Sequence, residues 1–410
     1  MAYSSLDESA IVDYVKNVGL YEQDESLTVK EIGDGNINMV FYVKNEKTGK
    51  SMIVKQAYPY VRCVGESWPL NQDRIRIEAE AIEKEGELAP GLVPKIYHQD
   101  DDMHIMVMED LSHLGVMRGQ MLTMTKFPKF ADHISTFLAN TLYFTSDIYM
   151  NPTDKKELVK SFINPDLCKI TEDLIFSDPY YDHERNNINP ALKPYLVDVF
   201  WKKPELRLEA SKFKYKFLTS AESLLHGDLH IGSMFGDSEE TKVFDSEFAF
   251  VGPMAFDIGL LIGNLLINYV SWSGKTDKFS EEQITDYRDH LETMINDIYN
   301  LFEKKFIANW NKKSEDILAE VEGYQQHFMK ELFSDTVGFA ALVMIRRMHG
   351  LAHNADVDDI ENEELRKDVQ VRMLELAEEM LMNREKYSKI EDITGFIKKN
   401  VELNKEAVVA

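Results

Sequence analysis

The pattern of apolar residues changes near Leu111, and this change constrains the fold more than any other feature of the chain. Before it, short apolar runs alternate with turn residues, as in a small antiparallel sheet that carries one helix. After it, apolar residues recur at helical spacing over long stretches. The sequence therefore predicts an α+β protein of two lobes, with a β-rich lobe at residues 1–110 and a larger, mainly α-helical lobe at residues 111–410.

The same patterns predict a set of strands and helices. The expected strands cover residues 27–32, 39–43, 51–56, 93–97 and 104–108. The expected helices cover residues 9–18, 73–84, 130–146, 204–223, 255–271, 281–310, 323–353 and 363–383. Residues 176–193 are polar and contain prolines, so a long loop is expected there. With 410 residues, the chain is long enough to bury a core in each lobe.

Charge and cysteine content narrow the classes of function. The 46 basic and 71 acidic residues give a net charge of −25, which disfavours binding to nucleic acid or to an anionic membrane. This charge is still compatible with a local basic pocket for a small anionic ligand. Cys63 and Cys168 are the only cysteines, which excludes a disulfide scaffold and a four-cysteine zinc site and favours a cytoplasmic protein.

Neither the longest apolar stretch nor the N-terminal residues indicate a membrane or secreted protein. The longest apolar stretch lies near residues 256–270 and contains Asp257, Asn264 and Asn268. A core helix is therefore expected there and not a membrane span. Residues 1–8 lack the basic and apolar segments of a signal peptide.

Two acidic loops follow each other closely in the second lobe. The first reads His226-Gly227-Asp228-Leu229-His230, and the second reads Asp245-Ser246-Glu247. Phosphoryl transfer needs one carboxylate to accept a hydroxyl proton and others to hold magnesium against phosphates. Asp228 is placed for the first role, and Asp245 and Glu247 for the second. In an extended segment, Asp245 and Glu247 would share one face, because side chains alternate with period two.

The His-Gly-Asp tripeptide alone is equally compatible with a solvated turn, so the features upstream matter. Residues 33–38 form a glycine-containing turn between two expected strands, where Gly35 and Asn36 could present backbone N–H groups to phosphate. Taken alone, such a sequence more often forms a plain hairpin turn. Lys55 ends the third expected strand, where kinase-like folds place a phosphate-binding lysine. Glu78 and Glu80 are both candidates to pair with it, and the choice stays open.

These motifs resemble those of the methylthioribose kinase family, in the aminoglycoside phosphotransferase and choline kinase-like branch of the protein-kinase-like fold. The matching segments are residues 31–38, 64–70, 107–112, 226–233 and 345–347, so the resemblance covers most of the chain. It implies a bilobal kinase fold. It also implies an S-methyl-5-thioribose kinase that uses ATP and Mg²⁺ to phosphorylate the 1-hydroxyl of 5-methylthioribose, in methionine salvage.

The resemblance further implies roles for individual residues. The ATP-binding residues would be Gly35, Asn36, Asn38, Lys55, Glu109, Asp110 and Leu111, the last three through the backbone at the adenine. Asp228 would be the catalytic base and would bind the substrate. Asp245, Glu247 and Ser233 would hold the metal, although Ser233 stands where related loops carry asparagine. The second loop usually reads Asp-Pro-Glu in the family, so Ser246 is expected to alter loop rigidity and to leave metal binding intact.

The acceptor side would be formed by two arginines and a tryptophan. Arg346 and Arg347 lie in an apolar helical stretch, and a buried arginine needs an anionic partner. They could form internal salt bridges, or they could act on substrate and transferring phosphoryl group as catalytic arginines. Trp68, in a loop bounded by glycine and proline, could be a lid over the substrate or a hydrophobic plug. His230 is expected to be structural or to orient the substrate, because magnesium prefers oxygen ligands.

Other functions and assemblies stay open from sequence alone. A related kinase could act on choline, homoserine or an aminoglycoside, although choline would favour an aromatic cage and the paired arginines would repel a polycation. A non-catalytic nucleotide-binding protein would have no physical need for Lys55, Asp228, Asp245 and Glu247 together. The amphipathic helices and methionines of the second lobe could form a homodimer face or serve core packing. Asp257 is expected to cap a helix or to brace the catalytic loop.

Overall fold

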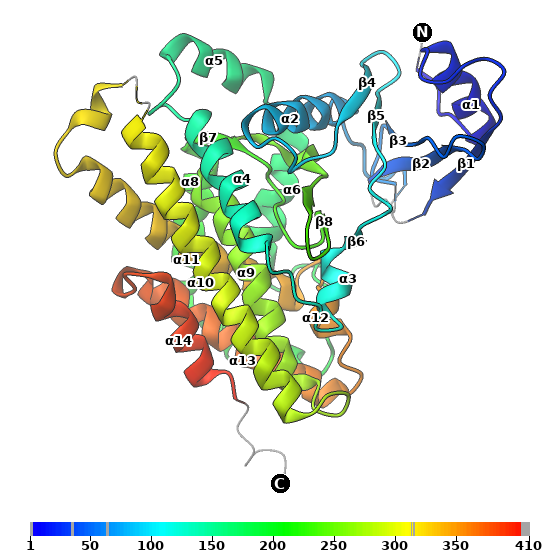
Figure 1. Cartoon of the computed structure of the whole chain (residues 1–410). Helices are drawn as coiled ribbons and strands as arrows, with labels where there is room; N and C mark the ends of the chain where they lie inside the picture. Colours follow the sequence, from blue (N-terminus) through cyan, green and yellow to red (C-terminus); the bar gives the residue numbers. More distant parts are fainter. Residues whose placement is uncertain (1–2, 34–36, 63–64, 313, 315, 403–410) are drawn as a thin grey trace.

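The computed structural model describes residues 3–33, 37–62, 65–312, 314 and 316–402. The first part of the chain forms a five-stranded antiparallel sheet in the order β1-β2-β3-β5-β4. Its strands are β1 (Leu27–Ile32), β2 (Asn38–Asn45), β3 (Ser51–Ala57), β4 (Ile96–Asp100) and β5 (Ile105–Glu109). Figure 1 shows this sheet in blue at one end of the molecule, with the helical part beside it.

Alternating side chains give the sheet two apolar faces, and a helix covers each. Phe41 and Val43 of β2 pack against Ile11 of α1 (Glu8–Asn17) on one face. Ile53 of β3 packs with Ile75 and the rest of the apolar stripe of α2 (Arg74–Leu88) on the other. Helix α2 therefore lies between the sheet and the helical part of the protein, where it can contribute side chains to both.

The rest of the chain is mainly helical, as predicted. Its helices are α3 (Met117–Met121), α4 (Phe130–Phe144), α5 (Pro152–Ser161), α6 (Pro165–Phe176), α7 (Lys193–Asp198), α8 (Pro204–Thr219), α9 (Ala255–Ser271), α10 (Glu281–Lys312), α11 (Tyr324–His349), α12 (Ala355–Asp358), α13 (Glu363–Asn383) and α14 (Ile390–Asn400). Short strands are β6 (Gly115–Val116), β7 (Ser223–Leu225), β8 (Met234–Gly236), β9 (Thr241–Val243) and β10 (Phe250–Gly252). Single 3₁₀ turns are η1 (Asp178–Tyr180), η2 (Phe200–Lys202), η3 (Ser246–Phe248), η4 (Trp272–Gly274), η5 (Ile317–Glu320) and η6 (Arg384–Lys386).

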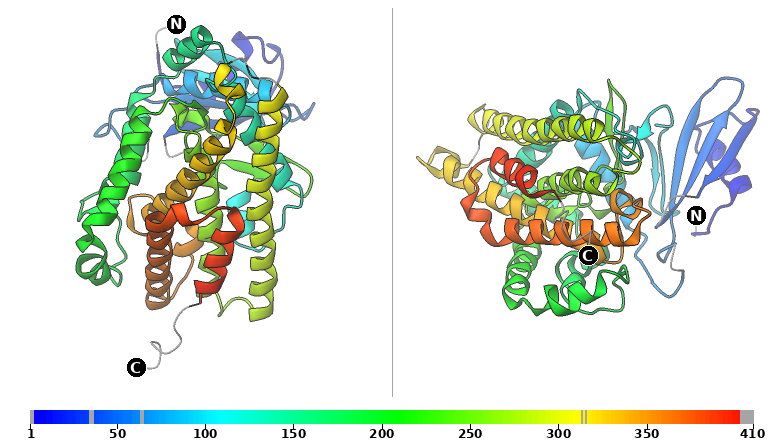
Figure 2. Two further views of the ribbon diagram at one scale, coloured as in Figure 1. Left: turned by 90° about the vertical axis from the view of Figure 1, so that its left-hand side faces the viewer. Right: turned by 90° about the horizontal axis from the view of Figure 1, so that it is seen from below.

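Helix α9 is the centre of this part, and every one of its residues is buried. It packs so closely against α11 that a Cβ on Gly263 would lie only 2.7 Å from the carbonyl oxygen of Ala340. The segment Ala255–Gly274 is long and apolar enough to cross a membrane, but its 18-residue apolar stretch, with a mean hydropathy of 1.3, is entirely buried in the protein. The prediction of a core helix is therefore confirmed. Figure 2 shows the helices running alongside one another away from the sheet.

The α+β architecture is confirmed, whereas several element boundaries differ from the prediction. Helices α5 and α6 fall in a stretch for which no helix was predicted, and each begins with a proline that follows an asparagine. Proline fits the first turn of a helix, so this signal was present in the sequence. The helix expected to reach residue 353 ends at His349, because Gly350 terminates it. The lobe boundary between residues 110 and 111 stays a prediction.

Candidate active site

The first acidic loop leaves strand β7, which pairs with β10. Its backbone is held by Asp257, in the first turn of α9, whose carboxylate accepts the N–H groups of His226 (2.7 Å) and Gly227 (3.0 Å). The brace expected of Asp257 is therefore confirmed. Gly227 adopts a φ of 82°, and a Cβ there would lie 2.2 Å from the carbonyl oxygen of Phe248, so the loop needs glycine at this position.

His226 joins this loop to the second one. Its Nδ1 accepts the N–H of Asp228 at 3.2 Å, and its Nε2 lies 3.0 Å from the carbonyl oxygen of Phe244. Because Nδ1 is an acceptor, Nε2 carries the ring proton and donates a hydrogen bond to the carbonyl oxygen of Phe244. The two acidic loops are thus tied together one residue before Asp245.

The second acidic loop is not extended, and the prediction that Asp245 and Glu247 share a strand face is wrong. Asp245 has a left-handed φ of 73°, and residues Ser246–Phe248 form the 3₁₀ turn η3. Aspartate tolerates this backbone region better than most residues. The buried Ser246 hydroxyl donates to the Glu85 carboxylate of α2 at 3.0 Å, which fixes the turn. Burial raises the pKa of Glu85 to about 8.

Three carboxylates meet beside Lys55. Oxygen atoms of Glu78, Asp245 and Glu247 lie within 4.8 Å of one another, and we call these residues the carboxylate cluster. Lys55 Nζ donates to Glu78 at 2.7 Å and also to Asp245. Burial raises the pKa of Glu78 and of Glu247. Burial alone would lower the pKa of Lys55, but the carboxylate cluster raises it above its ordinary value, so the ammonium stays charged.

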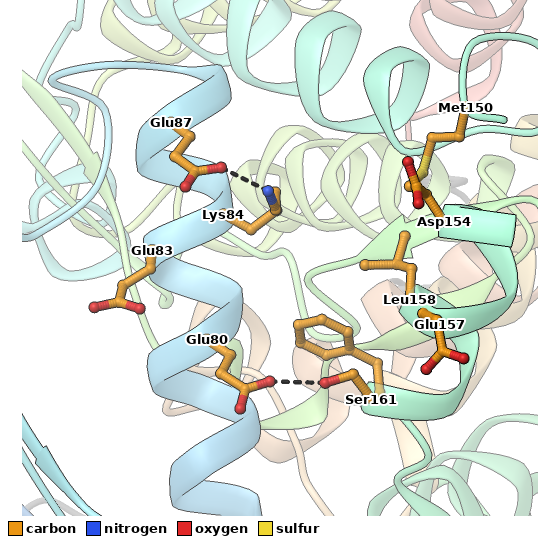
Figure 3. A pocket seen from close by; sticks show the side chains of 10 residues that line it. Glu80, Glu83, Lys84, Glu87, Met150, Asp154, Glu157, Leu158 and Ser161 are labelled. Carbon is orange, nitrogen blue, oxygen red and sulfur yellow. Dashed lines mark hydrogen bonds and ion pairs between the residues drawn. The ribbon is translucent and has the colours of Figure 1, made fainter.

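The open choice between Glu78 and Glu80 is decided by the rotation of α2. Glu80 points away from Lys55, toward α5, where it accepts hydrogen bonds from Arg76 and Ser161 at 2.9 Å each. Figure 3 shows Glu80 in an acidic groove between α2 and α5. Glu78 is therefore the partner of Lys55.

Asn38 and Arg74 extend the cluster toward the sheet. Asn38 Nδ2 donates to Glu247 at 2.6 Å, and its Oδ1 accepts from Arg74 Nε at 2.9 Å. Arg74 is buried at the start of α2, and nothing in the sequence pattern singled it out. Gly35 and Asn36, which were predicted to bind nucleotide, lie outside the described residues.

The crossing from the sheet to the helical part is braced by side chains. Asp110 accepts a hydrogen bond from the Ser51 hydroxyl at 2.7 Å, and the Glu109 N–H donates to the Lys95 carbonyl at 2.8 Å. Leu111 is buried immediately after them. The three predicted adenine-framing residues thus form a braced connection that begins at Glu109, the last residue of β5.

Asp228 faces a different environment, dominated by positive charge. Burial alone would raise its pKa, but the imidazole of His230, when it is protonated, together with the guanidinium groups of Arg347 and Arg346, outweighs burial and holds the pKa of Asp228 well below its usual range. His230 Nε2 lies 3.4 Å from Asp228 Oδ2. Burial lowers the pKa of His230 more than Asp228 raises it, so the ring is neutral near pH 7.

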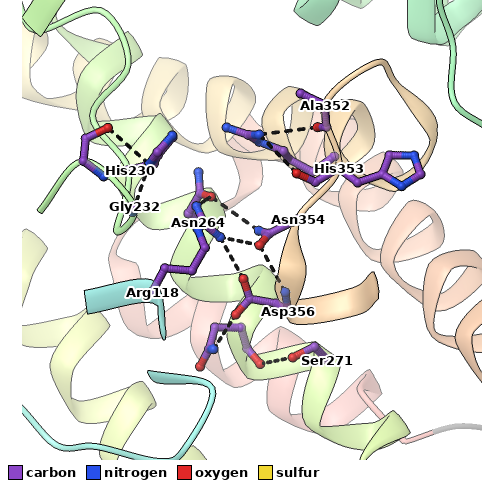
Figure 4. Close-up of polar contacts among 12 residues, drawn as sticks. Arg118, His230, Gly232, Asn264, Ser271, Ala352, His353, Asn354 and Asp356 are labelled. Atoms are coloured by element: carbon purple, nitrogen blue, oxygen red, sulfur yellow. Dashed lines mark hydrogen bonds and ion pairs between the residues drawn. The ribbon is translucent and has the colours of Figure 1, made fainter. Parts of the chain in front are cut away.

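A third arginine, which the sequence did not indicate, joins Arg346 and Arg347 here. Arg118, in α3, donates to Asp356 at 2.8 Å and to Asn264 of α9 at 2.9 Å (Figure 4). Its charge acts on both Arg346 and Arg347, and we call the three residues the arginine cluster. Only long-range packing brings Arg118 to this place, since Asp356 is 238 positions away.

The two neighbouring arginines differ in their contacts. Arg347 Nη1 lies 3.3 Å and 3.4 Å from the carbonyl oxygens of Ala352 and His353, just beyond the end of α11. The buried Nε atoms of both arginines have no hydrogen-bond partner among the described residues, and Arg347 alone of the two has a guanidinium nitrogen bound to carbonyl oxygens. Burial lowers the pKa of both arginines, and the charge of Asp228 opposes this. Arg346 is therefore the guanidinium with more donors left for a ligand.

Comparison with known proteins agrees with this geometry. A model of the phosphotransferase enzyme family matches residues 28–294, which include Lys55 and both acidic loops. A methylthioribose kinase of Geobacillus sp. (strain WCH70) is 41% identical over 399 residues, which is 97% of each chain. One of Yersinia enterocolitica is 38% identical over 399 residues, or 97% of this chain and 99% of the relative. The chain belongs to the methylthioribose kinase family. Among solved structures, an ethanolamine kinase of Plasmodium vivax is 14% identical, with a TM-score of 0.49 and coverage of 92% and 91%.

Two residues singled out from the resemblance to the methylthioribose kinase family make contacts within the protein. The Ser233 hydroxyl donates to the Asp228 carbonyl at 3.1 Å, and the Ser233 carbonyl accepts the N–H of Phe244 at 3.1 Å, one residue before Asp245. Trp68 packs on an apolar group that includes Leu70 and Leu167 of α6, which matches the plug alternative. Metal binding by Ser233 and substrate binding by Trp68 stay predictions for this family member.

Proposed function

We propose that this protein is a cytoplasmic, magnesium-dependent kinase that transfers the γ-phosphoryl group of ATP to the 1-hydroxyl of 5-methylthioribose. The product would be 5-methylthioribose 1-phosphate, an intermediate of methionine salvage. One observation carries the proposal: an ionised Asp228 lies among arginines, on a loop tied to a buried lysine–carboxylate cluster. Identity of about 40% to methylthioribose kinases over nearly the whole chain supports this acceptor.

Asp228 would receive the acceptor hydroxyl. Its low pKa makes it a weak base, so it orients the hydroxyl from the start and takes the proton late, as the bond to phosphorus forms. A late proton transfer is what a loose, metaphosphate-like transition state requires, since the nucleophile needs little activation. The proton would move from the 1-hydroxyl oxygen to a carboxylate oxygen of Asp228.

The carboxylate cluster fits magnesium, because its donors are oxygens and because burial makes its negative charges costly without a cation. Asp245 and Glu247 would hold the ion, which neutralises phosphate charge when bound. Lys55, oriented by Glu78, would bind the α- and β-phosphates. The Ser233 hydroxyl donates its proton to the Asp228 carbonyl, so its oxygen lone pairs would be the atoms that contact the ion.

The remaining ATP contacts would come from the sheet side. Asn38, whose amide donates to Glu247 in this structure, would contact the phosphates. The backbone of residues 109–111 would frame the adenine. Arg346, which keeps more free donors than Arg347, would bind the acceptor and the transferring phosphoryl group. A cationic acceptor such as choline or an aminoglycoside would be repelled by the arginine cluster.

A direct assay tests the proposal. Purified protein is mixed with Mg²⁺-ATP and 5-methylthioribose, and ³¹P NMR follows the anomeric phosphate while a coupled assay follows ADP. Choline, homoserine and an aminoglycoside are run in parallel as alternative acceptors. Folded protein that forms no 5-methylthioribose 1-phosphate would refute the proposal. Faster turnover of another acceptor would show that this other acceptor, and not 5-methylthioribose, is the substrate.

A further inference from the structure

We infer that His230 is a positioning residue, which holds the catalytic carboxylate of Asp228 by donating its Nε2–H to Oδ2. The inference rests on the proposed function, because it assigns a task to a neighbour of the proposed base. The backbone of the catalytic loop fixes the ring for this task, and three contacts carry the argument.

The first contact determines which ring nitrogen carries the proton. His230 Nδ1 accepts the backbone N–H groups of Gly232 at 3.0 Å and of Ser233 at 3.1 Å. An imidazole nitrogen that accepts hydrogen bonds has no proton of its own. The neutral ring must therefore carry its proton on Nε2, and the loop backbone excludes the other tautomer.

The second contact places the Nε2 side of the ring beside the carboxylate, and the inferred hydrogen bond is made there. His230 Nε2 lies 3.4 Å from Asp228 Oδ2, and the two side chains are 16% and 31% exposed. A donor placed there occupies one oxygen of the carboxylate and limits rotation about its χ2 angle. Oδ1 is then left as the oxygen that can accept the hydroxyl proton. A base held in this way meets the hydroxyl without a further entropic cost of ordering its side chain.

The third contact is the close packing of Gly232 against the His230 ring. A Cβ on Gly232 would lie 2.8 Å from His230 Cε1, 3.0 Å from Nδ1 and 3.1 Å from Arg118 Nε, so only glycine leaves room for both neighbours (Figure 4). The Ser233 hydroxyl donates to the Asp228 carbonyl and lies 3.3 Å from Nδ1, which closes the loop around the ring. Gly232 and Ser233 therefore both help to hold the His230 ring in place.

Substitution of His230 separates positioning from mere packing. We expect His230→Ala to lower kcat about 10²-fold with little change in KM for ATP, because a misplaced base costs about that much. His230→Gln can place an amide N–H near the Nε2 position and should recover part of kcat. Gly232→Ala should lower kcat by pushing the ring away. Gly395→Ala, whose Cβ would meet open space, is the matched control and should have no effect.

The tautomer is read directly in the full-length protein. With ¹⁵N-labelled histidine, two-dimensional ¹H–¹⁵N spectra should show the His230 signal, assigned by its loss in His230→Gln, with the Nε2–H pattern. An Nδ1–H pattern would overturn the inference, and so would wild-type kcat in His230→Ala. These outcomes differ from failure of the proposed function, in which wild-type protein does not phosphorylate 5-methylthioribose while the Nε2–H tautomer is still observed.

Discussion

The two sides of the catalytic loop carry opposite excesses of charge. On the nucleotide side, three carboxylates share one lysine, and burial raises the pKa of Glu78 and Glu247. On the acceptor side, Arg346 and Arg347 act on one ionised aspartate, Asp228, while Arg118 is paired with Asp356, and burial lowers the pKa of Arg346 and Arg347. Each side is therefore incomplete in a different sense. In the proposed function, a metal ion would supply the positive charge that the first side lacks, and the phosphoryl group in transfer would supply the negative charge that the second side lacks.

The largest effect is expected from removing the carboxylate charge of Asp228. Asp228→Asn should lower kcat by about 10³-fold or more, because the general base is lost. The carboxylate cluster is untouched, so the Kd for Mg²⁺-ATP from calorimetry should stay near the wild-type value. A variant with nearly normal turnover would remove Asp228 from the role of base.

The two adjacent arginines should respond differently, which sharpens the description of the acceptor side. Arg346→Gln should lower kcat about 10²-fold, since it removes a donor aimed at developing charge. Arg347→Gln should act mainly on Tm, because its guanidinium holds the carbonyls beyond α11. Steady-state kinetics and thermal melts of both variants check this, and the reverse pattern would exchange their roles.

Neutralising the carboxylate side should separate stability from metal dependence. Glu247→Gln removes a buried negative charge yet can still accept the hydrogen bond from Asn38, so Tm without ligands should stay equal or rise. The increase in Tm caused by Mg²⁺-ATP should shrink, and the Mg²⁺ concentration for half-maximal rate should rise roughly tenfold. An unchanged Mg²⁺ dependence would contradict the assignment of Glu247 to the metal.

A further prediction concerns pH and the buried Glu85, and its effect per pH unit is small. Its folded-state pKa of about 8 exceeds the usual 4.5, so the folded protein binds this proton more tightly than the unfolded chain. The stability contributed by neutral Glu85 is therefore present at pH ~4.5 and is lost as the pH rises to about 8, on the order of 1 kcal/mol per unit. Glu85→Gln should flatten this part of the stability profile measured by urea unfolding. Parallel profiles for both proteins would show that Glu85 does not titrate in this range.

Local motifs made the core of this site predictable. Asp228, Asp245 and Lys55 stand in short segments whose chemistry is set by neighbours along the chain, and the change of pattern near Leu111 was enough to give the α+β fold. The choice of Glu78 over Glu80 needed the rotation of α2, which single-sequence patterns do not give.

Residues that act through distant partners could not be predicted. Ser246 meets Glu85 across 161 positions, and Arg118 meets Asp356 across 238. The expectation of an extended Asp245–Glu247 segment failed for the same reason, because the turn is stabilised by α2 and not by its own sequence. Asparagine followed by proline at α5 and α6 was by contrast a local signal of a helix start.

Helix α9 sets a fixed spacing for the whole site. Asp257 holds the catalytic loop, Asn264 holds Arg118, and Asn268 binds Asp356, so one buried helix supports both the base and the arginine cluster. These positions are seven and four residues apart, which places them along one stripe. Each inserted residue would rotate the stripe by about 100° and lengthen it by about 1.5 Å. Insertions in α9 should therefore be much less tolerated in evolution than substitutions that preserve its length.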